Sequence, residues 1–207
     1  DAGNVFLDER GVVGIPIFAD PLVLYWNKDA LNAAGYAKPP EAWAEVQEMG
    51  EKMQKRNDAG AIVKSAIALG EYANVTNAKD ILTALIFQAG GQIVTRNEAG
   101  RPSAGLSSGA GTAQPAESAL RFYTEFANPS KSHYSWNRSL KESQKVFAAG
   151  DTALYIGFAS EAAIIAKTNP NLNFDVAPLP QIKDSARSVN TARVYGISIS
   201  RTAANPQ

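Results

Sequence analysis

The sequence predicts an α/β fold in which a central sheet is flanked by helices. Strand-length segments of apolar or alternating residues occur along the whole chain, and segments with helical periodicity follow most of them. Such alternation is typical of sheets that are covered by helices. The chain has 207 residues, of which 45% are hydrophobic, so it can build a proper core. We expect neither a helical bundle nor an all-β sandwich.

The N-terminal part predicts two strands, residues 11–18 and 22–26, with a bend at Pro21 between them. Asn27 is a residue type that caps helices, so a short helix is expected to follow it and to stop at Gly35. The predicted order at this end of the chain is therefore strand, bend, strand and helix.

A longer amphipathic helix is expected in "KPPEAWAEVQEMGEKMQKRND", with Pro40 at the first helical position and a stop at Gly60. Its apolar residues recur along one face, at Trp43, Val46, Gly50 and Met53. Because Trp43 belongs to this face, we expect a packed structural ring and not a ring exposed in a cleft.

The middle of the chain continues the alternation. Residues 61–69 predict a strand, and "TNAKDILTALIFQAGG" predicts a buried helix that a pair of glycines ends. From Gln92 to Gln114 the sequence is polar and rich in Gly and Ser, which favours a hairpin and a surface loop.

Six further elements complete the pattern. Two helices are expected in "PAESALRFYTEFAN" and in the segment from Ser139 to Gly150, followed by the strand "TALYIGF", the helix "SEAAIIAKTN" and the strands "NFDVAPLP" and "RVYGISIS". The first of these helices should turn four side chains inward: Ala116, Leu120, Tyr123 and Phe126. The strands should supply the core around six residues: Ile15, Leu24, Ile67, Tyr155, Val176 and Ile197.

Charge and composition exclude several classes of function. Twenty basic and twenty acidic residues cancel, so no basic field would attract nucleic acid or an anionic membrane. The chain has no Cys and a single His, His133, which leaves only carboxylates to complete a metal site. We interpret His133 as a surface loop residue. Neither a metal nor a nucleotide cofactor is expected, since no Gly-rich phosphate loop occurs.

The chain opens without the pattern of a signal peptide, and no run reaches about 18 apolar residues. We therefore expect any export signal or membrane anchor to lie outside this chain. The motif "GLSSG" resembles a nucleophile elbow around Ser107, but an elbow needs a buried strand before it and a helix after it. Ser107 lies in a polar loop segment, which favours an ordinary loop serine.

Two carboxylates at predicted strand ends, Asp20 and Glu71, could form a glycosidase pair. Asp20 could equally be an Asx-turn residue before Pro21, and Glu71 a solvated loop end. Three rings also fall at predicted loop or strand-end positions: Tyr72, Trp136 and Phe158. Rings at such positions suit the apolar faces of sugars, although each ring could instead pack against its own loop.

Several motifs carry a resemblance to a known family. The segment "GVVGIPIFADPLVLYWNKDALNAAGYAKPPEAWAEV" resembles the place where sugar-type extracellular solute-binding proteins of ABC importers cross into their second lobe. The segments "FAAGDTALYIGF", "NPNLNFDVAPLPQIKDS" and "VYGISIS" are similar to later motifs of this maltose-binding-protein-like family. Together they cover the chain nearly end to end.

The resemblance implies a two-lobe protein of about twice this length, in which a ligand is closed between the lobes by a hinge. Residues 1–207 would form one lobe, lobe two, with hinge-crossing segments at about 11–18 and 193–200. Asp20 matches an acidic position that accepts a hydrogen bond from a sugar hydroxyl, and Glu71 with Tyr72 resembles an acidic and aromatic pair. We expect one shared ligand site, composed of Asp20, Glu71, Tyr72, Trp136, Asn137, Phe158, Arg193 and Tyr195.

One position departs from the family pattern. Ser160 stands where a stacking tryptophan is expected after "YIG", and Phe158 lies two residues earlier. This difference argues against a maltodextrin as the ligand. The ring of Trp136 could replace the missing tryptophan.

The resulting hypothesis is a non-catalytic, monomeric, extracytoplasmic binding protein, periplasmic or lipid-anchored. It would deliver a small solute, expected to be a sugar, to the membrane permease of an ABC importer. The alternative is a carbohydrate-active enzyme that uses Asp20 and Glu71, and a third interpretation is a structural or adhesive surface domain. An enzyme would need a buried proton donor with a raised pKa and two facing carboxylates.

Overall fold

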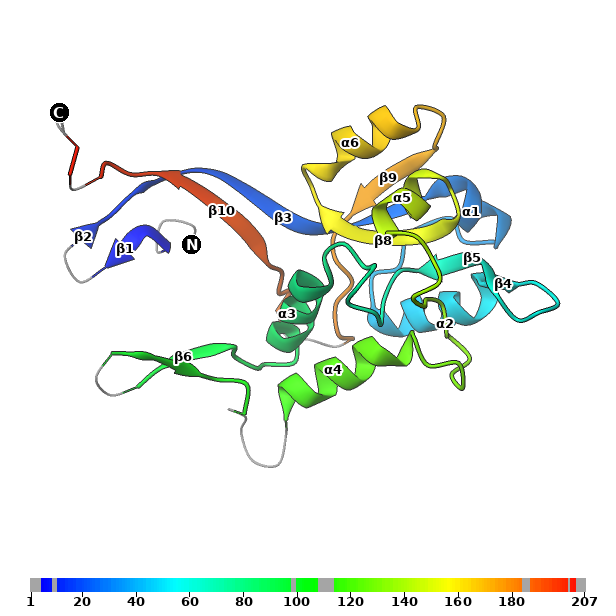
Figure 1. The fold of residues 1–207 in the computed structure, drawn as a ribbon, viewed down its shortest axis with the longest axis horizontal. Coiled ribbons are helices and arrows are strands. Elements are labelled where there is room, and N and C mark those ends of the chain that lie inside the picture. The colour runs from blue at the N-terminus through cyan, green and yellow to red at the C-terminus, as the bar shows by residue number, and fades with distance from the viewer. Residues whose placement is uncertain are drawn as a thin grey trace. The chain divides into compact units, whose positions relative to one another are not determined.

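The computed structural model describes residues 5–8, 11–97, 100–107, 114–183, 187–200 and 202–203 (Figure 1). Contacts divide the chain into a large unit, Leu22–Thr191, and a small unit, Asp1–Pro21 with Ala192–Gln207. No helix in the described part of the chain is both long and apolar enough to cross a membrane.

The large unit is built on one sheet with the strand order β9-β3-β8-β5-β4. Its strands are β3 (Ile15–Asn27, from Leu22 onward), β4 (Lys55–Arg56), β5 (Ile62–Ile67), β8 (Thr152–Phe158) and β9 (Phe174–Ala177). Strand β3 runs antiparallel to β8 and β9, whereas β5 runs parallel to β8. The sheet is therefore mixed. Its parallel pair needs a crossover connection between β5 and β8, and the segment that contains α3 provides it.

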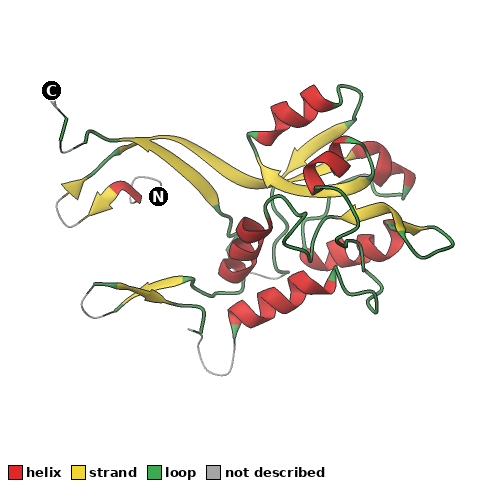
Figure 2. Cartoon of the chain, in the orientation of Figure 1, coloured by secondary structure: helices red, strands yellow, loops and turns green. Residues whose placement is uncertain are grey.

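Helices cover both faces of this sheet, as Figures 1 and 2 show. They are α1 (Lys28–Ala33), α2 (Trp43–Met53), α3 (Ala78–Gln88), α4 (Pro115–Glu125), α5 (Ser143–Ala148) and α6 (Glu161–Thr168). Leu22 and Leu24 of β3 belong to the larger core, beneath α2, α3 and α4. Val23 and Tyr25 belong to a smaller core with Phe147 of α5 and Ile165 of α6. The period-two alternation of one strand thus supplies both cores.

The small unit consists, in its described residues, of paired strands. Strand β1 (Leu7–Asp8) pairs with β2 (Gly11–Val12), and β10 (Ala192–Ile197) pairs antiparallel with the first half of β3. A separate hairpin of the large unit, β6 (Val94–Arg96) with β7 (Pro102–Ala104), agrees with the predicted hairpin. Residues 98–99 and 108–113 of the same predicted segment lie outside the described part.

The predicted α/β class, with a central sheet flanked by helices, is confirmed. Asn27 caps α1 as expected, because its Oδ1 accepts the backbone N–H of Ala30 at 3.0 Å. Trp43 is also confirmed as a structural ring. It is 5% exposed, and its Nε1 donates to Oε1 of Gln88 at 2.6 Å.

The two strands predicted on either side of Pro21 are one continuous strand, so the predicted bend does not divide them. Pro21 instead marks the point at which β3 changes neighbours. Residues up to Pro21 pair with β10, whereas pairing with β8 starts at Leu22. A proline, which has no N–H to donate, is compatible with a strand at such a change of partner.

Two helices begin later than predicted, and in each case a side-chain hydrogen bond holds the backbone in a turn before the helix. The Glu45 carboxylate accepts the backbone N–H of Glu41 at 2.8 Å, and α2 begins at Trp43, not at Pro40. Ser139 donates both its N–H and its hydroxyl to Oδ1 of Asn137, which holds it in a turn, and α5 begins at Ser143.

Several residues predicted to be buried are exposed. Leu120 of α4 is 49% exposed, because the buried face of that helix passes through Ala119 and Tyr123. Ile15 and Ile197 are both 66% exposed, since they pair with each other in the small unit, whose described residues include no α-helix to cover them. Val176 is 40% exposed on β9, at the edge of its sheet.

Two buried serines, Ser65 and Ser135, bind backbone groups at the end of β5. Ser135 is fully buried, and its Oγ accepts the backbone N–H groups of Ala66 and Ile67 at 3.1 and 2.9 Å. The same hydroxyl donates to the carbonyl of Ile67 at 2.8 Å, and Ser65 Oγ lies 3.1 Å away. Strand β4 pairs only with the first half of β5. Beyond the end of β4, the Ser135 side chain binds the backbone N–H groups of β5.

Candidate functional site

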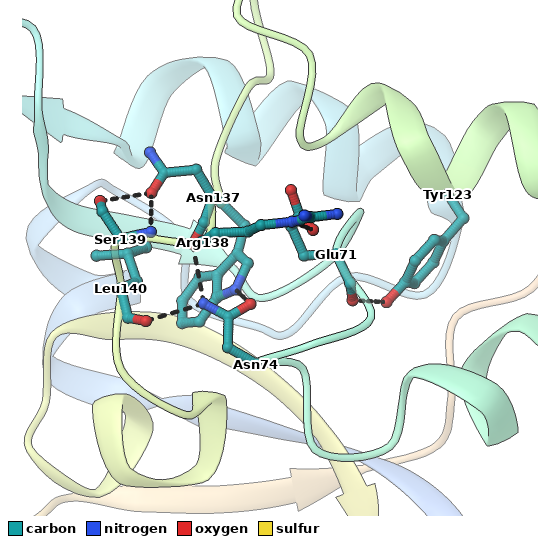
Figure 3. A network of polar contacts seen from close by, with 8 residues as sticks. Glu71, Asn74, Tyr123, Asn137, Arg138, Ser139 and Leu140 are labelled. Atoms are coloured by element: carbon teal, nitrogen blue, oxygen red, sulfur yellow. Dashed lines mark hydrogen bonds and ion pairs between the residues drawn. The ribbon is translucent and has the colours of Figure 1, made fainter.

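A network of polar contacts joins the loop after β5 to the loop between α4 and α5, as Figure 3 shows. Nε of Arg138 donates to Oε2 of Glu71 at 2.8 Å, and this hydrogen bond raises the pKa of the Arg138 guanidinium. The Arg138 side chain is 78% exposed, whereas that of Glu71 is 18% exposed. The hydroxyl of Tyr123 in α4 donates to the Glu71 carbonyl at 2.7 Å and so fixes the backbone from which the carboxylate projects.

The side chain of Asn74 lies at the centre of the same network. Its Nδ2 donates to the carbonyls of Asn137 and Leu140, both at 2.9 Å. Its Oδ1 accepts a hydrogen bond from Nε1 of Trp136 at 3.0 Å. The Asn137 side chain makes a further contact: its Nδ2 donates to the hydroxyl of Tyr134 at 2.7 Å. One amide side chain therefore connects the two loops.

Tyr72 follows Glu71 directly and is 78% exposed. It lines an open, polar hollow of about 510 Å³ with residues 73–76, Ala78, Lys79, Asp80 and Glu142. The Glu142 carboxylate is paired with Lys145 at 2.9 Å. The hollow thus combines an exposed ring with a rim of both signs of charge.

The far end of the loop after β5 is anchored inside the protein. Asn77 Nδ2 and the backbone N–H of Phe158 both donate to Oε1 of Glu161, each at 2.9 Å. The hydroxyl of Tyr155 donates to Oε2 of the same carboxylate, and burial raises the pKa of Tyr155, so its phenol keeps the proton that it donates. The segment between Glu71 and Asn77 is consequently held at both ends.

In the small unit, Asp20 of β3 lies directly opposite Arg193 of β10. Two residues away on each strand, Phe18 lies opposite Tyr195, with ring centroids 5.9 Å apart. Alternate residues of a strand share a face, so the polar pair and the aromatic pair lie side by side on one face. Asp20 is 3% exposed, whereas Tyr195 is 51% exposed.

The family model for bacterial extracellular solute-binding proteins matches residues 2–207 of the chain. The chain belongs to this family. The solute-binding protein also shares its fold with solved structures of low sequence identity.

One is an ABC transporter solute-binding protein from Thermotoga lettingae TMO bound with α-D-tagatose: the TM-score is 0.67 and the identity 20%, over 95% of this chain and 48% of that chain. Another is UgpB from Mycobacterium tuberculosis in complex with glycerophosphocholine: the TM-score is 0.70 and the identity 18%, over 98% of this chain and 46% of that chain. This solute-binding protein thus spans slightly less than half the length of either structure.

The eight residues expected to form the ligand site of this solute-binding protein fall into two groups. Glu71, Tyr72, Trp136, Asn137 and Phe158 lie in the large unit, and Asp20, Arg193 and Tyr195 lie in the small unit. Glu71, Trp136 and Asn137 take part in the network of Figure 3, and Tyr72 follows Glu71 in the chain. Asp20, Arg193 and Tyr195 share one face of the paired strands β3 and β10.

Two rings of the solute-binding protein do not lie at the surface positions that the sequence indicated. Trp136 is fully buried and Phe158 is 2% exposed, and both belong to the larger core. Burial of a large ring is strongly favourable, and the polar edge of Trp136 is satisfied by Asn74, so nothing in its local structure opposes burial. In this structure, neither ring presents a face to solvent.

The interpretation of His133 as a surface loop residue is wrong. His133 is 8% exposed, and its ring packs against Phe126 with centroids 4.9 Å apart. Its Nε2 lies 3.5 Å from Oε2 of Glu125, and burial lowers the pKa of the imidazole. Ser107 is exposed in a turn after β7, as expected, while Ser108 and Gly109 of its motif lie outside the described residues. Among the described residues of the solute-binding protein, no group of three or more His, Asp or Glu side chains could hold a metal ion.

Sequence reasoning missed Asn74 and Arg138. Both stand next to predicted site residues, Asn74 two positions after Tyr72 and Arg138 directly after Asn137. A search for planar polar side chains beside each exposed ring would have found them, because such groups recognise pairs of hydroxyls.

Proposed function

We propose that this chain is one lobe of a two-lobe solute-binding protein that captures a carbohydrate and delivers it to the permease of an ABC importer. Family membership supports a solute-binding role, and one structural relative is described as a solute-binding protein of an ABC transporter bound with α-D-tagatose. The chain covers less than half of each related structure. We therefore assign residues 1–207 to lobe two, with hinge-crossing segments at about 11–18 and 193–200.

The carbohydrate assignment rests on the Glu71–Arg138 pair and on the exposed ring of Tyr72, the residue that follows Glu71 in the chain. The contacts of Arg138 to described residues engage only its Nε, so its two terminal nitrogens remain as donors. Within the described part of the chain, the hydrogen bond to Arg138 engages only Oε2 of Glu71, so Oε1 remains as an acceptor. Neighbouring hydroxyls of a sugar both donate and accept hydrogen bonds, and a donor fork next to a carboxylate satisfies both roles.

The Tyr72 ring supplies an apolar surface on which a sugar ring can stack. A pyranose has an apolar C–H face, which an aromatic plane can cover while its hydroxyls reach polar groups at the edge. The hollow carries charges of both signs, Lys79, Asp80 and Glu142, and Glu142 is paired with Lys145. In the network of Figure 3, Arg138 is likewise paired with Glu71. A neutral polyhydroxylated ligand fits such a balance better than a strongly charged one.

We propose that Glu71, Tyr72, Asn137 and Arg138 of the large unit contact the ligand. Asp20, Arg193 and Tyr195 of the small unit are proposed as a separate group of ligand-binding residues. Trp136 and Phe158 would act from the core by supporting these groups. We further propose that the whole protein is a monomer outside the cytoplasm, periplasmic or lipid-anchored, and that it has no catalytic activity.

A thermal-shift screen of the full-length protein tests this function. The panel contains D-tagatose, D-glucose, maltose and glycerophosphocholine, and each compound is recovered afterwards and checked for chemical change. We expect a neutral sugar to raise the unfolding midpoint and to be recovered intact. A shift with glycerophosphocholine alone would contradict the carbohydrate assignment, and hydrolysis of maltose would favour the enzyme alternative that uses Asp20 and Glu71.

A further inference from the structure

The indole of Trp136 makes one polar contact that determines how a neighbouring amide is oriented. Trp136 is the largest fully buried side chain in the described part of the chain, and its Nε1 lies 3.0 Å from Oδ1 of Asn74. An indole N–H can only donate a hydrogen bond. The oxygen of the Asn74 amide must therefore face Trp136, and its NH₂ group must face the opposite way.

The NH₂ group of Asn74 meets two carbonyls on that opposite side. They belong to Asn137 and Leu140, and each accepts a hydrogen bond of 2.9 Å. If the amide were turned over, its NH₂ group would oppose the indole N–H and its oxygen would oppose both carbonyls. All three contacts would then become repulsive. The indole N–H and the two carbonyls thus favour the same amide orientation, in which the side chain binds both loops.

Arg138 lies between the two carbonyls that this amide holds. The backbone from Asn137 to Leu140 is tied to Asn74 at both ends, and Ser139 in the same turn donates to Asn137 Oδ1 at 2.9 Å through its N–H. The guanidinium reaches from this turn to Glu71, three residues before Asn74 in the other loop. The geometry of the Glu71–Arg138 pair therefore depends on the orientation of Asn74.

We propose that Trp136 is a positioning residue of the ligand site: its buried indole N–H orients the Asn74 amide and thereby fixes Arg138 against Glu71. This inference rests on the proposed function only for the statement that Arg138 contacts a ligand. The positional effect itself can be measured without any ligand.

The test compares two substitutions that remove the same chemical group. Trp136→Phe removes the indole N–H and keeps a buried ring. Trp43→Phe does the same at a second buried tryptophan, whose Nε1 donates to Gln88 of α3 and not to the site loops. The two variants are matched in chemistry, so a difference between them reports on the connection to the loops.

The readouts are the NMR signal of the Arg138 Nε–H and hydrogen exchange of backbone amides in residues 137–140, in the full-length protein without ligand. In Trp136→Phe we expect the Arg138 signal to move or broaden and exchange in residues 137–140 to be about fivefold faster, as the loss of one hydrogen bond predicts. Trp43→Phe should leave both readouts unchanged. Equal effects of the two substitutions, or no effect of Trp136→Phe, would overturn the proposal.

Asn74→Asp provides an independent variant in case Trp136→Phe fails to fold. Asp retains an acceptor for the indole but has no NH₂ group for the carbonyls of Asn137 and Leu140, so the Arg138 signal should change as in Trp136→Phe. An unchanged signal in a folded Asn74→Asp protein also contradicts the proposal. If these readouts change while no sugar binds in the thermal-shift screen, the positional inference stands and the proposed function fails.

Discussion

The guanidinium of Arg138 and the carboxylate of Glu71 form an ion pair of 2.8 Å between residues that are 67 positions apart in the sequence. Water screens this pair strongly, because the Arg138 side chain is 78% exposed. The pair therefore contributes little to the stability of the fold. Its main effect is to hold two planar polar groups side by side at the surface.

Replacing Arg138 with Ala should weaken sugar binding and leave stability nearly unchanged. We expect affinity to fall about 5- to 30-fold, which corresponds to one or two lost hydrogen bonds. Calorimetric titration with the sugar that gives the largest thermal shift measures the effect. Arg121→Ala is the matched control, because Arg121 is 72% exposed and pairs with Glu117 at 2.7 Å on α4. Equal affinity losses in both variants would argue against a specific role of Arg138.

Tyr72 should contribute through its ring and not through its hydroxyl. Tyr72→Ala removes an exposed ring, so we expect about a 10-fold loss of sugar affinity with an unchanged unfolding midpoint. Tyr72→Phe keeps the ring and should bind sugar within about threefold of the parent. If Tyr72→Phe is as defective as Tyr72→Ala, the hydroxyl is the recognising group and ring stacking is excluded.

Gly70→Ala should destabilise the protein and disturb the site together. Gly70 has φ +97°, and an added Cβ would lie 2.5 Å from the backbone nitrogen of Ala127, which cannot rotate away. We expect a loss of about 2–4 kcal/mol in the free energy of unfolding, from backbone strain and overpacking. Gly60→Ala is the control: its φ is +77°, but no atom lies within 4 Å of the added Cβ. It should cost only about 1–2 kcal/mol. Urea unfolding compares the two, and equal losses would contradict the packing argument.

The stability of the protein should fall as the pH drops below about 6.5, in part because of His133. Burial lowers the pKa of His133 in the folded state, so below the unfolded pKa the unfolded chain binds a proton more readily than the folded chain does. Glu125 and Glu51 oppose this shift, whereas Lys131 reinforces it. The stabilisation is present above pH 6.5 and is lost as the pH falls through the folded pKa.

Unfolding midpoints between pH 7.5 and about 5.5 test this effect, because carboxylates titrate mainly below that range. His133 is the only histidine in the chain, so His133→Gln should flatten the slope whatever it does to stability at pH 7.5. An unchanged slope in His133→Gln would mean that another group is responsible.

The sequence predicted well those elements whose local pattern agrees with the tertiary structure. The apolar face of α2 at Trp43 and Val46 is buried as expected, and the cap at Asn27 is present. Both could be predicted because the pattern that indicates them, an apolar spacing or a capping residue type, lies within a few residues. In contrast, the starts of α2 and α5 depend on hydrogen bonds in the turn before each helix. The Glu45 carboxylate accepts the backbone N–H of Glu41, and Oδ1 of Asn137 accepts that of Ser139. The sequence pattern does not show which of these hydrogen bonds forms.

Burial of single side chains was harder to predict, because it depends on which other element covers each position. Leu120 has the right spacing for a buried face, but α4 turns Ala119 and Tyr123 toward the core. Trp136 and His133 lie in a segment without helical or strand periodicity. No pattern there reveals that the His133 ring packs against Phe126 or that the Trp136 indole donates to Asn74. The candidate site was predicted in part, through Glu71, Tyr72 and Asn137, whereas the connection from Asn74 to Arg138 required the folded loops.

The hydroxyl of Ser135 has a consequence for how copies of this protein behave beside one another. A strand with free N–H groups at the rim of a sheet can recruit a strand from another molecule and so begin aggregation. Here the N–H groups of Ala66 and Ile67 are already occupied by a single buried oxygen. Ala66, Ile67 and Ser135 are all fully buried, so a foreign strand would have to displace Ser135 from the interior before it could pair with this half of β5.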